Sequence, residues 1–289
     1  MSTIEKALNR LQANARSQDG KMQTPQDRAQ PSPDAPFQPA PAGGKPLVDM
    51  SKLRRYDILP PAEMRQTLRD QYRRIKRPLI ANALGRGVTA VPRGNTMVVT
   101  SAVASEGKTF TALHLAMSIA QDPDLSVTLV DGDISRSRIT RLLDLVDEPG
   151  LLDLLGNSQL DIAEVLRLTN IDSLSIIPAG GQHGLGEELL SSARMGEVLK
   201  RVADPNPHHI TLFDSAPILK SPEATALAAG IGQVVMVVKA SSTMQHQVLA
   251  ALDMLDPNKP INLILNQTLG GGTADEEYGG YYGEAYGNS

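Results

Sequence analysis

The stretch TMVVTSAVASEGKTF, residues 96–110, decides the fold of this chain. Its first residues form an apolar run typical of a buried strand, and AVASEGKT (102–109) fits the phosphate-loop pattern G-x-x-x-x-G-K-[ST], with Ala102 in place of the first glycine. In this pattern successive backbone N–H groups surround phosphates, Lys108 adds positive charge, and the Thr109 hydroxyl can bind Mg²⁺. A helix that begins near Thr109 would point its positive end at the same anion. We therefore predict a nucleotide site between this strand and this helix.

Further apolar runs alternate with helical patterns along the rest of the chain. Buried strands are predicted at 127–131, 174–179, 210–216, 233–238 and 261–266. Helices are predicted at 110–120, 186–203 and 244–255. This alternation predicts the α/β class, with a mostly parallel sheet of the P-loop NTPase type and helices on both faces. Ligands of such folds bind at the carboxyl ends of the strands.

Three aspartates follow predicted strands. Asp131 and Asp133 close the run VTLVDGD, and Asp214 closes ITLFD. Because the strand ends meet at one edge of the sheet, these carboxylates are expected beside the phosphate loop. Mg²⁺ is usually bound by one or two carboxylates together with nucleotide phosphates and water. A carboxylate can also help to deprotonate a tyrosine hydroxyl, whose pKa is about 10.

The chain before the first strand divides into two parts. Residues 1–46 combine a short amphipathic helix (2–12) with a linker that has seven prolines between Pro25 and Pro46 and is expected to be disordered. The helix either docks on a partner or folds back on the domain. A longer helix is predicted at 60–85, with Pro78 kinking it or ending its first half.

Tyrosines gather at the end of the chain. Four of the six lie in GTADEEYGGYYGEAYGNS (272–289), namely Tyr278, Tyr281, Tyr282 and Tyr286. Glycines separate them, and the segment has no Leu, Ile, Val or Met with which to build a core. Residues 273–289 are therefore predicted to form a flexible tail and 47–272 a folded domain. The tail is either a weakly adhesive low-complexity segment or a set of substrate hydroxyls.

Composition excludes several classes of protein. The chain has no cysteine, so disulfides and cysteine-bound zinc are ruled out. Its formal net charge of −4 gives no general attraction to nucleic acid, and no nucleic-acid partner is predicted. Neither a signal-peptide pattern nor an apolar run of about 18 residues is present in the sequence. A cytoplasmic location is expected, with membrane contact through a partner.

The motifs SEGKT, LVDGDIS and LFDSAP, followed by the tyrosine-rich tail, resemble the bacterial tyrosine kinases (BY-kinases) of the CpsD/CapB type. DQYRRIKRPLIANA resembles the subgroup associated with exosortase (XrtA) exopolysaccharide loci. The resemblance covers about residues 60–289. It implies an ATP- and Mg²⁺-dependent autokinase that phosphorylates tail tyrosines in trans within a ring of subunits, an octamer. It also implies a role in exopolysaccharide or capsule export with a membrane protein that controls chain length.

The resemblance assigns a role to each matching residue. Lys108 and Thr109 would hold phosphates and Mg²⁺, Asp131 would be the base toward the incoming tyrosine, and Asp133 and Asp214 would organise the metal. The rest of the nucleotide set comprises Ala104, Ser105, Glu106, Gly107 and Phe110. Asn266 ends the last strand where relatives contact adenine, and a plain strand-end asparagine is the alternative there. The phosphate acceptors would be Tyr278, Tyr281, Tyr282 and Tyr286.

The loops depart from the family pattern at four positions. Ala104 and Ser105 replace a proline and a glycine, so Ser105 must adopt a backbone geometry that glycine takes more freely. Ser135 stands where an arginine is usual, and D-[ST]-P-P lacks one of its two prolines, because DSAP has Ala216 before Pro217. These departures leave the activity level open.

Arginines recur every four residues at Arg65, Arg69, Arg73 and Arg77. They form a solvated charged face, a nucleic-acid surface or an oligomer interface. The family's interface element E-x-x-R-x-x-R is matched here by Asp70, Arg73 and Lys76 with two conservative changes.

Two other functions are compatible with the phosphate loop. One is an ATPase switch of the ParA/MinD kind, although these proteins carry a lysine where this chain has Val103 and have no use for clustered tyrosines. The other is a nucleotide-binding regulatory subunit without transfer activity.

Overall fold

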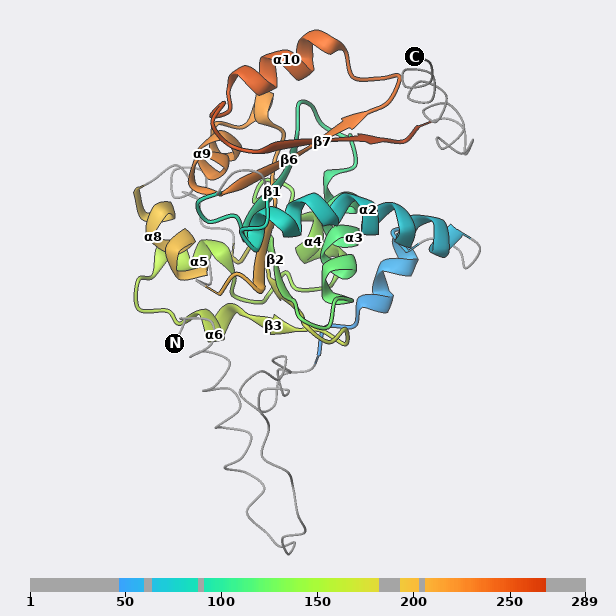
Figure 1. The fold of residues 1–289 in the computed structure, drawn as a ribbon. Helices are drawn as coiled ribbons and strands as arrows, with labels where there is room; N and C mark the ends of the chain where they lie inside the picture. Colours follow the sequence, from blue (N-terminus) through green and yellow to red (C-terminus); the bar gives the residue numbers. More distant parts are fainter. Residues whose placement is uncertain (1–46, 60–63, 88–90, 182–192, 203–205, 269–289) are drawn as a thin grey trace, which may run out of the picture.

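The computed structural model describes residues 47–59, 64–87, 91–181, 193–202 and 206–268. A seven-stranded sheet crosses the middle of the molecule in the order β3-β4-β2-β5-β1-β6-β7 (Figure 1). The strands are β1 Thr96–Ser101, β2 Ser126–Asp131, β3 Arg167–Leu168, β4 Leu174–Ile177, β5 His209–Asp214, β6 Gln233–Lys239 and β7 Ile261–Asn266. Every neighbouring pair is parallel except β3 with β4. The predicted mostly parallel sheet is confirmed, and only the two-residue β3 was not predicted.

Helices cover both faces of the sheet (Figure 1). One face carries the 3₁₀ helix η1 and helices α2, α3 and α4. These are η1 Met50–Tyr56, α2 Arg65–Ala83, α3 Lys108–Ala120 and α4 Arg138–Leu142. The other face carries α5 Leu151–Gly156, α6 Ile162–Val165, α8 Ala193–Val202, the 3₁₀ helix η3 Ile218–Lys220, α9 Pro222–Gly230 and α10 Gln245–Asp253.

Side-chain alternation along the strands divides the interior into two apolar cores. In β1, Val98 packs into the core beneath α5, α8 and α9, whereas Met97 and Val99 pack into the core beneath α2 and α3. All six residues of β1 are buried, as expected for a central strand of a parallel sheet covered on both sides. The apolar runs in the sequence follow from this double coverage.

The helix predicted at 60–85 differs from the observed α2. The described helix begins at Arg65 and continues through Pro78 to Ala83, so Pro78 does not end its first half. Proline lacks one N–H, but packing of Tyr72, Leu79 and Ala83 in the core holds the helix on both sides of it.

Two buried polar side chains fasten α2 to the rest of the fold. Lys76 Nζ donates to Ser118 O at 2.6 Å and pairs with Asp122 at 2.9 Å, at the end of α3. Gln233 in β6 donates to Leu79 O and accepts from Asn82 Nδ2 at 2.9 Å. The position of α2 is therefore set by polar contacts as well as by apolar packing.

Several predictions lie outside the described residues. They are the helix at 2–12, the proline-rich linker, the first part of the helix at 186–203 and the tyrosine tail. The division into 1–46, 47–272 and 273–289 thus stays a prediction. Among the helices that the structure describes, none is long and apolar enough to cross a membrane.

Candidate nucleotide site

The loop between β1 and α3 has the backbone geometry of an anion cradle. Ser105 and Gly107 have positive φ angles of 66° and 95°, and α3 begins at Lys108. Positive φ is unfavourable for a residue with a Cβ. Ser105 nevertheless adopts it, as expected from the sequence, at a position where glycine would adopt it more freely. The curled loop and the helix N-terminus together present backbone N–H groups toward the same region.

Glu106 fixes this loop from inside. Its side chain is almost fully buried and accepts from Val103 N at 2.8 Å, from Lys239 N at 3.2 Å and from the Thr243 hydroxyl. Lys239 ends β6, so the contact joins the loop to the neighbouring strand and to the turn before α10. Glu106 therefore braces the cradle.

Asn266 braces the loop from the end of β7. Its Nδ2 donates to Glu106 O at 2.8 Å. The same nitrogen lies so close to Gly107 that a Cβ there would approach it to 2.1 Å. The amide is therefore engaged with the loop, and the predicted contact of Asn266 with adenine stays a prediction.

Asp131, at the end of β2, is buried and rigidly held. Its Oδ2 accepts from both Thr140 N (2.9 Å) and Thr140 Oγ1 (2.7 Å). Its Oδ1 is buried without a hydrogen-bond partner among the described residues. Burial raises the pKa of Asp131 to about 6, although the Thr140 hydrogen bonds oppose the shift. One carboxylate oxygen is therefore fixed, while the other keeps its capacity to accept a proton.

Asp214 lies beside Asp131 because β2 and β5 are paired in register at these residues. Neither oxygen of its buried carboxylate has a hydrogen bond within ordinary limits among the described residues, although the nearby Thr109 hydroxyl and the Lys108 charge both lower its pKa. Burial, reinforced by the charge of Asp131, raises the pKa of Asp214 to about 8. A buried carboxyl without partners is costly in a folded protein, which points to a ligand.

Lys108 and Asp133 complete the charged group. Burial lowers the pKa of Lys108, while Asp214, Asp133 and Glu106 act in the opposite direction. Asp133 Oδ1 accepts from Ser135 Oγ at 2.8 Å and from Arg136 N at 3.3 Å, so Ser135 supports Asp133 directly. The structure thus brings Lys108, Asp131, Asp133 and Asp214 to one edge of the sheet, as the sequence predicted.

The residues present fit a Mg²⁺–nucleotide complex. Within the described part of the chain, no three His, Cys, Asp or Glu side chains form a metal cage by themselves. Mg²⁺ is commonly held by one or two carboxylates plus phosphate oxygens, so such a cage is not required. The orphaned oxygens of Asp214 are hard ligands of the kind that Mg²⁺ prefers.

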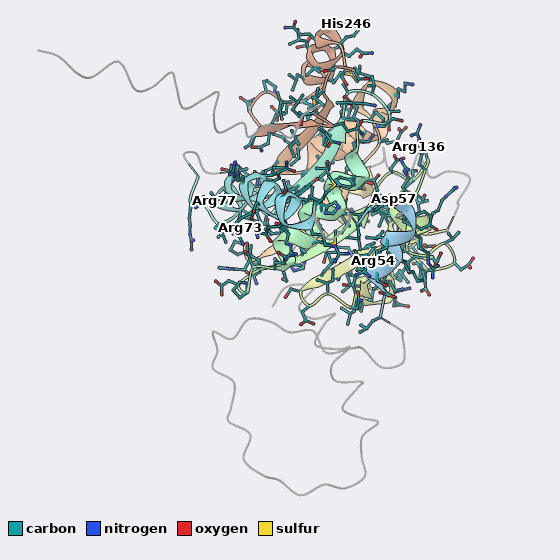
Figure 2. All side chains as sticks on the ribbon, turned by 90° about the vertical axis from the view of Figure 1, so that its right-hand side faces the viewer. Arg54, Asp57, Arg73, Arg77, Arg136 and His246 are labelled. Atoms are coloured by element: carbon teal, nitrogen blue, oxygen red, sulfur yellow. The ribbon has the colours of Figure 1, made fainter. Side chains whose placement is uncertain are left out.

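Some predicted site residues lie elsewhere. Phe110 packs on His114 with ring centroids 4.3 Å apart, at the edge of the core beneath α2 and α3. Lys76 is committed to α3, whereas Arg73 is exposed on the outer side of α2 (Figure 2). The four tail tyrosines lie outside the described residues.

Sequence reasoning missed Thr140 as a partner of Asp131. Thr140 is nine residues farther along the chain, in a segment without a motif, and its hydroxyl also accepts from Ala179 N at 2.9 Å. Beside it lies a cavity of about 540 Å³, whose lining includes Thr140, Arg141, Asp153 and Gly180. Thr140 thus both hydrogen-bonds to Asp131 and lines this cavity.

Known proteins resemble this chain in sequence. The tyrosine-protein kinase wzc of Salmonella typhi is 29% identical over 191 residues, which cover 65% of this chain and 26% of wzc. The tyrosine-protein kinase YwqD of Bacillus subtilis is 27% identical over 216 residues, which cover 74% of this chain and 86% of YwqD. The chain is thus similar in sequence to these tyrosine-protein kinases. It spans about a quarter of the length of wzc, and no protein-family model matches it.

The fold is also similar to solved structures, including that of the chimerical protein CapA2B2. That likeness has a TM-score of 0.56 at 20% identity and covers 75% of this chain and 93% of CapA2B2. Apo McdA of Cyanothece is similar too, with a TM-score of 0.50 at 21% identity over 59% of this chain and 71% of McdA. At these identities the likeness establishes the fold alone.

Proposed function

We propose that this chain is an ATP-dependent protein-tyrosine autokinase that phosphorylates Tyr278, Tyr281, Tyr282 and Tyr286 in trans. The observation that carries the proposal is the site itself. A braced phosphate loop lies beside a buried carboxylate, Asp131, whose Oδ1 has no partner among the described residues. The sequence similarity to tyrosine kinases over 65% of this chain supports it.

The proposed reaction assigns separate tasks to the residues of the chain. The loop N–H groups and Lys108 hold the phosphates of ATP, and Thr109, Asp133 and Asp214 would hold Mg²⁺. Bound Mg²⁺ would supply positive charge beside the terminal phosphate. Oδ1 of Asp131 takes the proton of the tyrosine hydroxyl. The tyrosine oxygen forms a bond to the terminal phosphorus of ATP, and the bond between that phosphorus and ADP breaks. With a pKa of about 6, Asp131 is ionised at neutral pH and can accept this proton.

Assembly and cellular role form the wider part of the proposal. Tails reach neighbouring sites in a ring-like homo-oligomer, an octamer by family resemblance, whose interface includes Asp70 and Arg73. The kinase acts in the cytoplasm, is recruited to the membrane by a chain-length-determinant protein and regulates exopolysaccharide or capsule export. Its placement in the exosortase-associated subgroup belongs to the same proposal.

Incubation with γ-labelled ATP and Mg²⁺ tests the proposal. An autokinase yields phosphotyrosine that maps to residues 278–286, and Lys108→Met yields none. Release of ADP and phosphate without phosphotyrosine would instead indicate a ParA/MinD-type ATPase switch. Nucleotide binding without turnover would indicate a regulatory subunit.

A further inference from the structure

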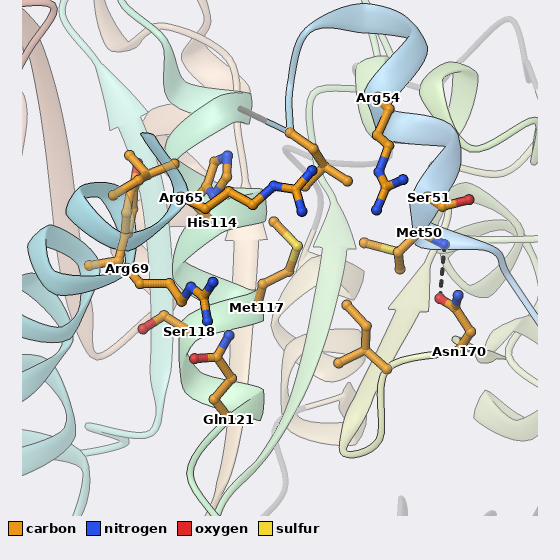
Figure 3. Close-up of a pocket in the computed structure, with 14 residues that line it drawn as sticks. Met50, Ser51, Arg54, Arg65, Arg69, His114, Met117, Ser118, Gln121 and Asn170 are labelled. Carbon is orange, nitrogen blue, oxygen red and sulfur yellow. Dashed lines mark hydrogen bonds between the residues drawn. The ribbon is translucent and has the colours of Figure 1, made fainter. Parts of the chain in front are cut away.

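A second cavity lies apart from the nucleotide site. It occupies about 310 Å³ between η1, α2 and α3 (Figure 3). Helix α3 contributes His114, Met117 and Ser118, and Gln121 follows its last residue, whereas the phosphate loop lies at its first residue. At 1.5 Å per residue, Lys108 lies about 9 Å from His114 and about 15 Å from Ser118 along the helix. A ligand in this cavity would therefore leave the nucleotide site free.

The cavity combines an apolar floor with a positively charged mouth. Leu59, Leu68, Tyr72 and Met117 are among its lining residues. Arg54 of η1 and Arg65 and Arg69 of α2 extend their guanidinium groups toward the space between the two elements (Figure 3). Among the described residues that line the cavity there is no Asp or Glu. The site therefore suits a ligand with an apolar ring and a strongly negative group.

Two of the three arginines at the mouth, Arg54 and Arg69, have no ion pair within the described residues. The neighbouring Asp49 accepts from Ser51 and Asn170, and Asp70 accepts from Gln66. Guanidinium groups bind phosphate with paired, charge-assisted hydrogen bonds, and clusters of them recognise phosphorylated acidic segments.

We propose that this cavity binds a phosphotyrosine of the chain's own C-terminal segment, residues 272–289. That segment has four tyrosines, the four acidic residues Asp275, Glu276, Glu277 and Glu284, and no lysine or arginine. The aromatic ring lies against the apolar floor, and the phosphate binds Arg54 and Arg69. At about 310 Å³ the cavity is at the lower end of the range of about 300–1,000 Å³ for small-ligand pockets, which suits a single side chain.

This inference rests on the proposed function only for the origin of the phosphate. Its consequence is retention of the product. A tail that has been phosphorylated at the nucleotide site then binds in this second cavity. It no longer competes with unphosphorylated tails for the nucleotide site.

Binding of synthetic peptides tests the proposal without any kinase activity. The full chain carries Phe at positions 278, 281, 282 and 286, and no ATP is present. Fluorescently labelled peptides of residues 272–289 contain one phosphotyrosine at a time, one phosphoserine in its place, or no phosphate. At least one phosphotyrosine peptide is expected to bind tenfold or more tightly than its phosphoserine and unphosphorylated counterparts, because only it combines ring and phosphate.

Arginine variants locate the site. Arg54→Gln and Arg69→Gln are each expected to weaken phosphotyrosine binding about tenfold, as loss of a charge-assisted hydrogen bond predicts. Arg77→Gln is the matched control, since its side chain is exposed on α2 (Figure 2) and does not line the cavity. It is expected to change the affinity by less than twofold.

Three results would overturn the proposal. Equal binding of the phosphoserine peptide would show that the ring is not recognised. Equal losses for Arg69→Gln and Arg77→Gln would indicate a general basic surface. Binding of phosphatidylglycerol vesicles that needs Arg54 and Arg69, without peptide binding, would make this a lipid site. Because the peptide phosphate comes from synthesis, a failed autokinase assay and a failed binding assay remain distinct results.

Discussion

At the scale of single residues, the buried carboxyl of Asp214 is the feature that most needs a ligand. Both of its oxygens lack hydrogen-bond partners among the described residues, and burial raises its pKa to about 8. A group of this kind lowers the stability of the free protein. Under the proposed function Asp214 gains partners when Mg²⁺ and nucleotide bind, so ligand binding offsets that loss of stability.

Asp214→Asn is expected to raise the stability of the free protein at pH 8 or above by roughly 1–3 kcal/mol, because burial and the Asp131 charge disfavour the ionised carboxylate more than Thr109 and Lys108 favour it. At about 2–4 °C per kcal/mol, the thermal midpoint should rise by several degrees. The stabilisation that Mg²⁺ and a non-hydrolysable ATP analogue give the wild type should shrink. Differential scanning fluorimetry measures both effects. Asp253→Asn, on the exposed side of α10, is the control, and a midpoint below the wild-type value would contradict the account.

His114 gives the stability a defined pH dependence. Burial lowers its pKa, although the hydrogen bond to Ile58 O at 2.8 Å opposes the shift. Below its unfolded pKa of about 6.5 the unfolded chain binds a proton that the folded chain does not, so this contribution to stability decreases as pH falls. Burial raises the folded pKa values of Asp131 and Asp214, so their contribution to stability increases as pH falls.

His114→Gln isolates that contribution, since the aspartates are unchanged. Between pH 7.5 and 5.5 the free energy of unfolding should decrease more for the wild type than for the variant. Urea unfolding at each pH measures the difference. His246→Gln, exposed on α10 (Figure 2), should behave as the wild type. Parallel pH profiles of wild type and His114→Gln would count against the assignment.

At the scale of elements, the phosphate loop depends on contacts from β6 and β7. Gly107 has φ of 95°, and an added Cβ would lie 2.1 Å from Asn266 Nδ2. Gly107→Ala should therefore displace the loop, cost about 1–3 kcal/mol of stability and weaken nucleotide binding at least tenfold. Gly85 also has positive φ, of 67°, but nothing lies within 4 Å of its added Cβ. Gly85→Ala should thus leave nucleotide affinity unchanged, and an equal loss of affinity in both variants would refute the argument.

The same comparison of elements indicates what the sequence alone could predict. The six strand runs and the placement of Lys108, Asp131, Asp133 and Asp214 followed from apolar periodicity and motif spacing, because a sheet covered on both faces requires uninterrupted apolar strands. η1 and β3 were not predicted, since they are short and leave no periodic signal. The contact of Thr140 with Asp131 depends on tertiary packing, and no local pattern encodes it.

At the scale of the whole molecule, the basic helix α2 has two kinds of cation. Lys76 is buried and holds α3 of the same chain, whereas Arg73 is exposed (Figure 2). The cations of the proposed interface element thus differ in role. Lys76 stabilises the subunit, and Arg73 is accessible to a neighbouring copy.

Lys76→Met is expected to cost about 1–3 kcal/mol of stability, because Ser118 O loses its buried donor. Arg73→Ala should leave the stability within about 0.5 kcal/mol and should dissociate the oligomer. Chemical unfolding and multi-angle light scattering measure the two effects separately. An oligomer of unchanged mass in Arg73→Ala would exclude this residue from the interface.

Transfer of phosphate between copies is the most direct test of the account. A Lys108→Met copy with an intact tail is mixed with a copy that carries Phe at 278, 281, 282 and 286, and Mg²⁺ and ATP are added. Intact-mass spectrometry resolves the two chains. The account predicts phosphate on the Lys108→Met chain, within residues 278–286, and none on either chain alone. If the mixture, in which nucleotide binding has been verified, leaves the tyrosines of the Lys108→Met chain unmodified, phosphorylation in trans is contradicted.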